Sequence, residues 1–303
     1  MDVMGRRNLF FVISAIVILV GLVFLATRGL NLGVDFTGGS LIRVRFDHPV
    51  TAAKVRDALT APELADMHLE KGIIQPIEGT NDVQIRAHVQ GRPLSDPQLK
   101  RVVDALSARF GSASVIEAEM VEPVIGRELL SKAMMAVLLG WIGILIYVSV
   151  RFEYRFAVAG VAALIHDVLV ILGMFAILGR EINSPFIAAV LTIVGYSIND
   201  TIVVFDKIRE NLKFRKRETY EELVNKSITQ TLGRSLNTSL TTLLPVIALY
   251  LFGGATIKDF SLALIIGLIS GTYSSIFIAS PIWLIWKNWE RDRLRKVAVA
   301  KAR

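Results

Sequence analysis

Polar side chains recur along one side of an apolar stretch in the middle of the chain. Between Ala188 and Asp206 they lie three or four residues apart, at Thr192, Tyr196, Asn199 and Asp200. At 100° per residue, these positions cover roughly a third of a helix circumference. An acid in the middle of a membrane helix costs about 2.5–3.5 kcal/mol on insertion scales, so Asp200 should face protein or water. The pattern predicts a functional acid at Asp200, with Asn199 beside it.

A cation and several hydroxyls follow at the start of the next apolar stretch. One helical face there carries Arg234, Thr238, Thr241 and Pro245. Arg234 has the right depth to reach Asp200 if the two stretches are neighbouring membrane spans. One hypothesis is a structural ion pair that holds two helices together, and the other is a proton relay that Thr238 extends.

The chemistry of this pair suits a proton relay. Burial disfavours an ionised carboxylate, whereas a nearby guanidinium favours it. A conformational change that separates Asp200 from Arg234 would therefore raise the proton affinity of the acid, and re-pairing would release the proton. One charge that crosses ~100 mV is worth ~2.3 kcal/mol, so several protons suffice to bias a domain movement.

Two further polar residues, His166 and Asp167, lie near the centre of another apolar stretch. They make either a hydrogen-bonded contact between helices or a second station of the relay, and the sequence leaves both open. Small residues also recur at intervals of four in the last stretch, which predicts a helix-packing face at Gly267, Gly271 and Ser275.

Several classes of chemistry lack support in the sequence. The chain has no cysteine, which excludes disulfides, thiolate chemistry and cysteine-ligated metals. It also lacks a P-loop, an HExxH motif and a GxSxG motif, so neither ATP-driven nor hydrolytic catalysis is expected. We expect a protein that is not an enzyme and that needs no cofactor or metal.

The composition predicts a polytopic α-helical membrane protein. Of 303 residues, 53% are hydrophobic, and the charged 20% cluster between long apolar runs. Six runs are long enough to span a bilayer, at 9–27, 132–150, 157–178, 185–206, 236–253 and 261–286. The first follows Arg6 and Arg7 without a cleavage signal, which predicts a retained signal anchor. The expected divisions are 1–28 (cytoplasmic N-terminus and span one), 29–131 (an outer domain), 132–286 (spans two to six) and 287–303 (a basic tail).

Lysine and arginine placement predicts the orientation. They are dense between Lys207 and Arg234 and after residue 287, whereas the loops 179–184 and 254–260 carry only Arg180 and Lys258. Both termini are therefore expected in the cytoplasm of a bacterial inner-membrane protein, with 28–131 outside. The basic run 207–217 fits orientation and contact with anionic lipid, or docking to an acidic or RNA-bearing partner. The placement of lysine and arginine in the loops explains the net charge of +7 better than a nucleic-acid partner does, so no nucleic-acid partner is expected.

The outer segment predicts a small α+β domain. Strands are expected at 41–46, 73–77, 82–89 and 114–121, with helices at 51–60 and 96–110. The order β-α-β-β-α-β is that of the ferredoxin-like split βαβ motif. No residue set in this domain indicates catalysis, and the fold alone does not define a function.

Two motifs resemble those of the SecF family of the bacterial Sec protein translocase. One is LGVDFTGG after the first span, which contains Asp35, Phe36, Thr37, Gly38 and Gly39, and the other is the run from Gly195 to Asn211. By themselves, the glycines of the first motif predict only a turn that opens the outer domain. The order of one span, an outer domain and five spans also matches the family.

The resemblance implies function and partners. It implies membership of the resistance-nodulation-division superfamily and proton-driven late-stage protein export with SecD. Further implied partners are the SecYEG translocon, with YajC and YidC as candidates, and the exported unfolded polypeptide. It also implies that Asp200 and Arg234 line the proton path. The alternatives are half of a small-molecule or lipid exporter of the same superfamily, and a scaffold subunit that conducts no protons.

Overall fold

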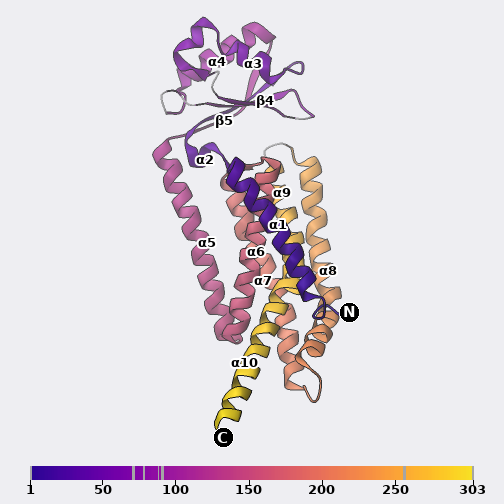
Figure 1. Cartoon of the computed structure of the whole chain (residues 1–303). Helices are drawn as coiled ribbons and strands as arrows, with labels where there is room; N and C mark the ends of the chain where they lie inside the picture. Colours follow the sequence, from indigo (N-terminus) through magenta and orange to yellow (C-terminus); the bar gives the residue numbers. More distant parts are fainter. Residues whose placement is uncertain are drawn as a thin grey trace. The chain divides into compact units, whose positions relative to one another are not determined.

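The computed structural model describes residues 2–69, 72–77, 79–87, 89, 92–254 and 257–301. The chain divides into two compact units (Figure 1). One consists of Met1–Asn31 together with Ala136–Arg303, and the other is Leu32–Met135.

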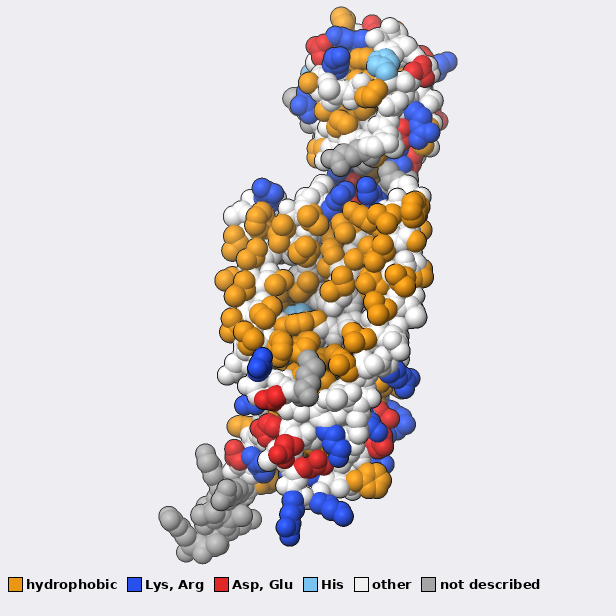
Figure 2. All heavy atoms as spheres, turned by 90° about the vertical axis from the view of Figure 1, so that its right-hand side faces the viewer, with side chains coloured by type: hydrophobic (Ala, Val, Ile, Leu, Met, Phe, Trp, Pro, Cys, Tyr) orange, Lys and Arg blue, Asp and Glu red, His pale blue; other side chains and the backbone are white. Residues whose placement is uncertain are grey.

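Six helical segments are long and apolar enough to cross a membrane, which confirms the predicted number. The first five are α1 (Arg7–Arg28), α5 (Pro123–Arg151), α6 (Tyr154–Leu178), α7 (Ser184–Lys213) and α8 (Tyr220–Phe252). The sixth combines α9 (Lys258–Ser274), a π-helical turn at Ser275–Ala279 and α10 (Ser280–Lys301). A band of hydrophobic side chains covers the helices, and charged side chains gather at the bundle end that carries the α7–α8 connection (Figure 2).

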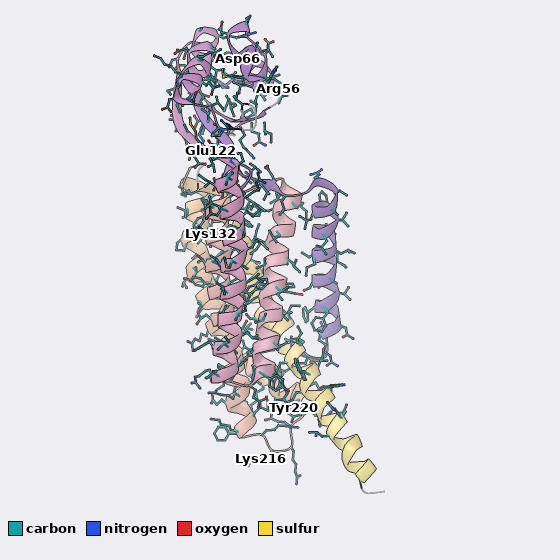
Figure 3. The ribbon with its side chains drawn as sticks, turned by 90° about the vertical axis from the view of Figure 1, so that its left-hand side faces the viewer. Arg56, Asp66, Glu122, Lys132, Lys216 and Tyr220 are labelled. Carbon is teal, nitrogen blue, oxygen red and sulfur yellow. The ribbon has the colours of Figure 1, made fainter. Side chains whose placement is uncertain are left out.

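Helices α7 and α8 are longer than the apolar pattern predicted. The interpretation of 207–234 as a connection was wrong, because α7 continues to Lys213 and α8 begins at Tyr220; Lys216 and Tyr220 mark the short link (Figure 3). Thr219 and Glu222 cap α8, since the Thr219 amide donates to Glu222 Oε2 at 2.8 Å and the Glu222 amide donates to Thr219 Oγ1 at 3.2 Å. Charged residues interrupt the apolar pattern after Asp206, but the α7 helix continues through them to Lys213.

Helix packing in the larger unit centres on α6, α7 and α9. The α7–α9 and α1–α6 pairs make the most extensive helix contacts. A Cβ atom on Gly21 of α1 would lie 2.7 Å from the Cα atom of Gly173 on α6, so only glycine permits this approach. On α9, a Cβ atom on Gly271 would lie 3.0 Å from Ser197 Cβ of α7. The face of small residues expected on the last span therefore packs against α7.

The segment before α1 is fastened to the start of α8. The amides of Val3 and Met4 both donate to Asn225 Oδ1 at 2.9 Å, and Asn225 Nδ2 donates to Asp2 Oδ1 at 2.9 Å. The side chains of Val3 and Met4 are buried in the core of the helical unit. Asn225 therefore connects the beginning of the first span to the fifth.

The smaller unit contains a four-stranded antiparallel sheet. Its strands are β2 (Gly39–Phe46), β3 (Ile73–Pro76), β4 (Asp82–Ala87) and β5 (Ala113–Val121), in the spatial order β3-β4-β2-β5. Ile42 pairs with Ile85 of β4 and with Ala118 of β5, which sets the register. Residue 88, within the expected strand 82–89, lies outside the described residues. The remaining short strands are β1 (Asn31–Leu32) and β6 (Glu181–Ile182).

Helices α3 (Ala52–Ala58) and α4 (Asp96–Phe110) complete this unit, with a 3₁₀ helix at Pro62–Met67 that the sequence did not predict. Val55 of α3 and Val102 and Leu106 of α4 are buried with the inner side chains of the sheet. The Arg101 guanidinium forms a bidentate pair with Asp66, at 2.9 and 3.1 Å. This pair holds the pKa of the Asp66 carboxyl below its usual range.

Candidate functional site

Asp200 lies inside the helical unit, on the side of α7 that faces α8 and α9. It is 8% exposed and lines a cavity of about 20 Å³. Its Oδ2 atom is buried and has no hydrogen-bond partner among the described residues. The cavity is rich in hydroxyl groups, and its other lining residues are Tyr196, Ser197, Thr238, Ser239, Gly267, Leu268, Gly271 and Thr272. A buried carboxylate oxygen thus faces a water-sized space.

The polar stripe predicted on α7 divides between two cavities. Tyr196 lines the small cavity with Asp200, whereas Asn199 lines a larger cavity of about 540 Å³. Thr192 lines neither cavity, and its hydroxyl donates to the Ala188 carbonyl of its own helix at 2.8 Å. Helical spacing identified the face correctly, but neighbouring helices divide it.

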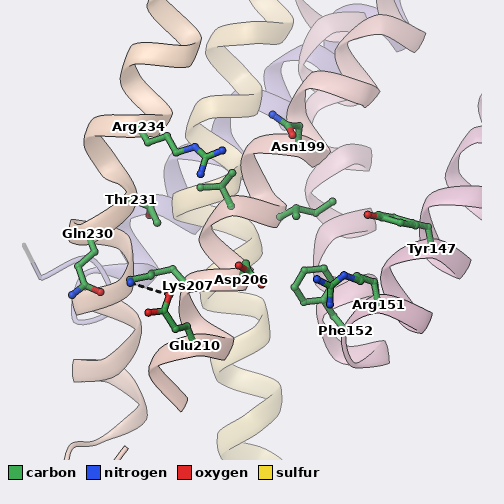
Figure 4. A pocket seen from close by; sticks show the side chains of 12 residues that line it. Tyr147, Arg151, Phe152, Asn199, Asp206, Lys207, Glu210, Gln230, Thr231 and Arg234 are labelled. Atoms are coloured by element: carbon green, nitrogen blue, oxygen red, sulfur yellow. Dashed lines mark hydrogen bonds and ion pairs between the residues drawn. The ribbon is translucent and has the colours of Figure 1, made fainter. Parts of the chain in front are cut away.

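Arg234 lies on α8 and lines the larger cavity with Asn199 (Figure 4). In the part of the chain that the structure describes, no ion pair joins Arg234 to Asp200. Arg234 does not begin its helix, because α8 begins 14 residues earlier, at Tyr220, and the depth of Arg234 in the membrane stays a prediction. Thr238, one turn further along α8, is the residue of this face that lines the cavity with Asp200.

The larger cavity contains two local ion pairs and two further cations. Lys207 Nζ lies 3.0 Å from Glu210 Oε2, and Asp206 pairs at 3.1 Å with Arg209, which lies outside the lining (Figure 4). Arg151 and Arg234 form no ion pair with any described residue and are largely exposed. The cavity therefore offers an approach of net positive charge to the polar face of α7.

Asp167 is enclosed by hydrogen-bond donors from three helices. It is 1% exposed, and its Oδ2 atom accepts from Ser197 Oγ of α7 at 2.6 Å and from Ser274 Oγ of α9 at 2.8 Å. Its Oδ1 atom accepts from Ser270 Oγ at 2.7 Å and contacts His166 Nδ1 at 3.1 Å. Among the described residues this acid has a complete set of donors, unlike Asp200.

The other side of His166 continues the network to α1. His166 Nε2 lies 3.1 Å from Ser14 Oγ, Ser14 Oγ donates to the Tyr273 hydroxyl at 3.2 Å, and that hydroxyl donates to the Phe10 carbonyl at 2.8 Å. His166 and Asp167 thus join α1, α6, α7 and α9, as the interhelical hypothesis expected.

Sequence reasoning missed the hydroxyls that complete this network. The missed residues are Ser14, Ser197, Ser270, Tyr273 and Ser274. A usable signal existed, because a buried acid needs several donors and Ser270 and Ser274 lie one helical turn apart in an apolar span. The choice among the many hydroxyls of the chain required the packing of the helices.

The motif after the first span forms one helical turn, α2 (Val34–Thr37), that ends in two glycines. Gly38 and Gly39 have φ angles of 73° and 116°, as expected for a turn that only glycine adopts readily. Phe36 is buried, and the Thr37 hydroxyl donates to the Gly33 carbonyl at 3.0 Å. Asp35 and its neighbours therefore shape the entry to the smaller unit.

The described residues contain no group of three or more His, Cys, Asp or Glu side chains that could hold a metal.

Comparisons with known proteins agree with this arrangement. The family described as "Protein export membrane protein SecD/SecF, C-terminal" matches residues 101–289, and the "SecD/SecF GG Motif" matches residues 23–50. "Protein translocase subunit SecF" of Acidaminococcus fermentans is 45% identical, over 95% of this chain and 97% of the relative. The subunit of the same name from Alicyclobacillus acidocaldarius is 43% identical, over 95% and 93%.

Longer relatives contain this chain as one part. The crystal structure of SecDF from Thermus thermophilus, described as a translocon-associated membrane protein, has a TM-score of 0.86 and 39% identity. The match covers 95% of this chain and 39% of the SecDF chain. "Protein translocase subunit SecDF" of Bacillus subtilis is 39% identical, over 95% of this chain and 38% of the relative. Both family motifs and the match to SecF subunits over nearly their whole length show that this chain belongs to the SecF family of protein translocase subunits.

Proposed function

We propose that the chain is an accessory subunit of the Sec translocon that works with SecD and uses the proton motive force to promote protein export. The observation that carries the proposal is the environment of Asp200. A buried carboxylate oxygen without a hydrogen-bond partner among the described residues, beside a cavity lined by hydroxyls, is suited to gain and lose a proton.

Arg234 and Asn199 extend this proposal toward solvent. They line the larger cavity at the polar end of the bundle, next to the small cavity that Asp200 and Thr238 line. When α7 and α8 move closer together, the guanidinium of Arg234 stabilises the ionised acid and Asp200 releases its proton. When the helices separate, the acid takes up a proton again. In this mechanism Asp167 and His166 hold the helices that carry the switch.

The orientation and the outer domain belong to the same proposal. We place both termini in the cytoplasm of a bacterial inner-membrane protein, since lysine and arginine crowd the α7–α8 link and the end of the chain. The smaller unit is then extracytoplasmic, where it meets the exported polypeptide. Its element order and its strand order β3-β4-β2-β5 support a ferredoxin-like fold.

SecD is the proposed partner within the membrane. Tyr196, Asn199 and Arg234 are exposed on α7 and α8 although they lie within candidate spans, and polar groups at membrane depth require cover. The chain aligns with 39% of a structure named SecDF, and that name supports SecD as the partner. SecYEG, YajC and YidC are further proposed contacts.

The substitution Asp200→Asn tests the proposal. It keeps the shape of the side chain and removes its titration, so the complex should assemble but lose stimulation of export by the proton motive force. The measurement is translocation of a secretory precursor into inverted membrane vesicles, with and without a protonophore. Asp292→Asn is the matched control, because Asp292 is exposed, pairs with Arg291 and lines neither cavity. Full stimulation by the Asp200 variant would support the scaffold alternative. The exporter alternative has less support, because the relatives that this chain matches over nearly their whole length are translocase subunits.

A further inference from the structure

A buried network of hydrogen bonds runs from the Phe10 carbonyl to Asp167. The Tyr273 hydroxyl donates its one hydrogen to the Phe10 carbonyl, and Ser14 Oγ lies 3.2 Å from the Tyr273 hydroxyl and 3.1 Å from His166 Nε2. The single hydrogen of Ser14 serves one of these two neighbours, and the tautomer of His166 decides which.

His166 and Asp167 hold each other through one hydrogen bond on the same helix. His166 Nδ1 lies 3.1 Å from Asp167 Oδ1, and two lone pairs at that distance would repel, so a hydrogen lies between the two atoms. The three serine hydroxyls around Asp167 complete the satisfaction of this buried polar pair.

Ser197 stands between this pair and Asp200. Its hydroxyl donates to Asp167 Oδ2 at 2.6 Å, and the same residue lines the small cavity with Asp200. The cavity, at about 20 Å³, has room for one water molecule. A serine hydroxyl has a single hydrogen, so while it points at Asp167 only the oxygen lone pairs remain for the cavity.

We infer that Ser197 is a positioning residue that couples the His166–Asp167 pair to the protonation of Asp200. While the Ser197 hydrogen is committed to Asp167, its oxygen accepts from the cavity and favours the protonated form of Asp200. When Asp200 ionises, the hydrogen turns to the cavity and Asp167 loses one donor. The inference rests on the proposed function, because it assumes that Asp200 changes its protonation during export.

The neighbouring groups do not supply this link by another route. Among the described residues, the other charged or titratable groups around the cluster are Tyr196 on α7, Arg234 on α8 and Tyr273 on α9, and Ser235 of α8 adds a buried hydroxyl beside Asp200. Tyr273 already donates to the Phe10 carbonyl, and Arg234 lines the other cavity. Helix α1 contributes the neutral Ser14.

Ser197→Ala and Ser274→Ala form a matched pair of variants. Both serines are buried and donate to the same Oδ2 atom of Asp167, at 2.6 and 2.8 Å, but only Ser197 lines the cavity. We expect the two variants to lose similar thermal stability. Only Ser197→Ala should shift the pH profile of export stimulation, by about one unit toward acid, which is the tenfold effect of about one hydrogen bond.

Infrared titration of the purified full-length chain gives a second measurement that does not depend on export. The carboxyl band that Asp200→Asn removes should move with pH differently in Ser197→Ala than in wild type, and unchanged in Ser274→Ala. Identical behaviour of the two serine variants in the infrared titration would overturn the inference, whatever the export assay shows. Such a result, combined with loss of stimulation in Asp200→Asn, would leave the proposed function intact.

Discussion

Replacement of aspartate by asparagine should have very different effects on stability at the two buried acids, Asp167 and Asp200. Asp167→Asn and Asp200→Asn each replace one carboxylate oxygen by an NH₂ group at nearly constant shape. Asp167 contacts four donor groups, whereas Asp200 has a buried oxygen with none among the described residues. Asp167→Asn should therefore destabilise the helical unit strongly, and Asp200→Asn should change its free energy of unfolding by less than about 0.5 kcal/mol.

The magnitude for Asp167→Asn follows from its partners. At the Oδ1 position the new NH₂ group can donate to a lone pair on His166 Nδ1, and it displaces only the Ser270 hydroxyl. The more damaging placement is at the Oδ2 position. There it displaces two serine hydroxyls; Ser274 has the Gly271 carbonyl at 3.2 Å as an alternative acceptor, whereas Ser197 has none in the described network. Three interhelical bonds, to Ser197, Ser270 and Ser274, at about 0.6 kcal/mol each set a lower value of about 1.8 kcal/mol for complete loss. Breaking a buried charged pair costs about 3–5 kcal/mol. We expect a loss of about 2–4 kcal/mol.

Unfolding in mixed detergent micelles, followed by circular dichroism, measures both variants under the same conditions. Export stimulation in vesicles gives the complementary measurement, in which Asp200→Asn should fail although it folds normally. Equal stability losses in the two variants would refute the reasoning, because they would show that donors around Asp167 contribute nothing specific.

Three further predictions follow from other parts of the fold. Gly173→Ala should lower the stability of the helical unit by about 1–3 kcal/mol in thermal unfolding, because the new Cβ atom would lie 2.9 Å from the backbone of α1; Gly143→Ala, with open space around it, is the control. Asn225→Ala should leave two amides of the N-terminal segment without their acceptor and accelerate their hydrogen exchange. Because Arg101 lowers the pKa of Asp66, their pair contributes stability above the usual pKa of that carboxyl and loses it as pH falls through the folded value. Arg101→Gln should return the Asp66 titration, followed by NMR, to its usual range.

The sequence was sufficient to predict those features of the fold that depend on residues close together in the chain. Apolar length alone identified six spans, and the helix Asp96–Phe110 was predicted with the bounds that the structure shows, because its apolar residues recur at helical spacing. Glycine pairs predicted the turn at Gly38 and Gly39 for the same reason. These features depend on backbone geometry and on the bilayer, and both act within a few residues.

The predicted helix ends were wrong where charged residues were taken to mark the end of a helix. The polar residues after Asp206 ended the apolar pattern, yet the α7 helix continues to Lys213, and Leu223 and Ile228 anchor the first turns of α8 in the core. Arg234 therefore lies within a helix that begins earlier than the apolar pattern predicted. The network around Asp167 was beyond reach because its donors come from three helices whose rotations only packing determines.

The contrast between the acids also indicates which helix moves. Asp167 joins α6 to α7 and α9 through hydrogen bonds that are all made, so relative movement of these helices would leave buried donors unsatisfied. The small cavity at Asp200 lies between α7, α9 and α8, and α8 contributes hydroxyls there without any bond to Asp167. Ser239 of α8 makes one bond to Thr272 of α9, at 2.6 Å, which can be exchanged for water or a helix carbonyl. Displacement of the part of α8 beside the small cavity therefore breaks fewer bonds than displacement of α6, whereas Asn211, Asn225 and the buried Leu223 hold the first turns of α8 in place. A proton switch built on Asp200 should accordingly work by moving the part of α8 that carries Thr238 and Ser239 against a rigid group of α6, α7 and α9.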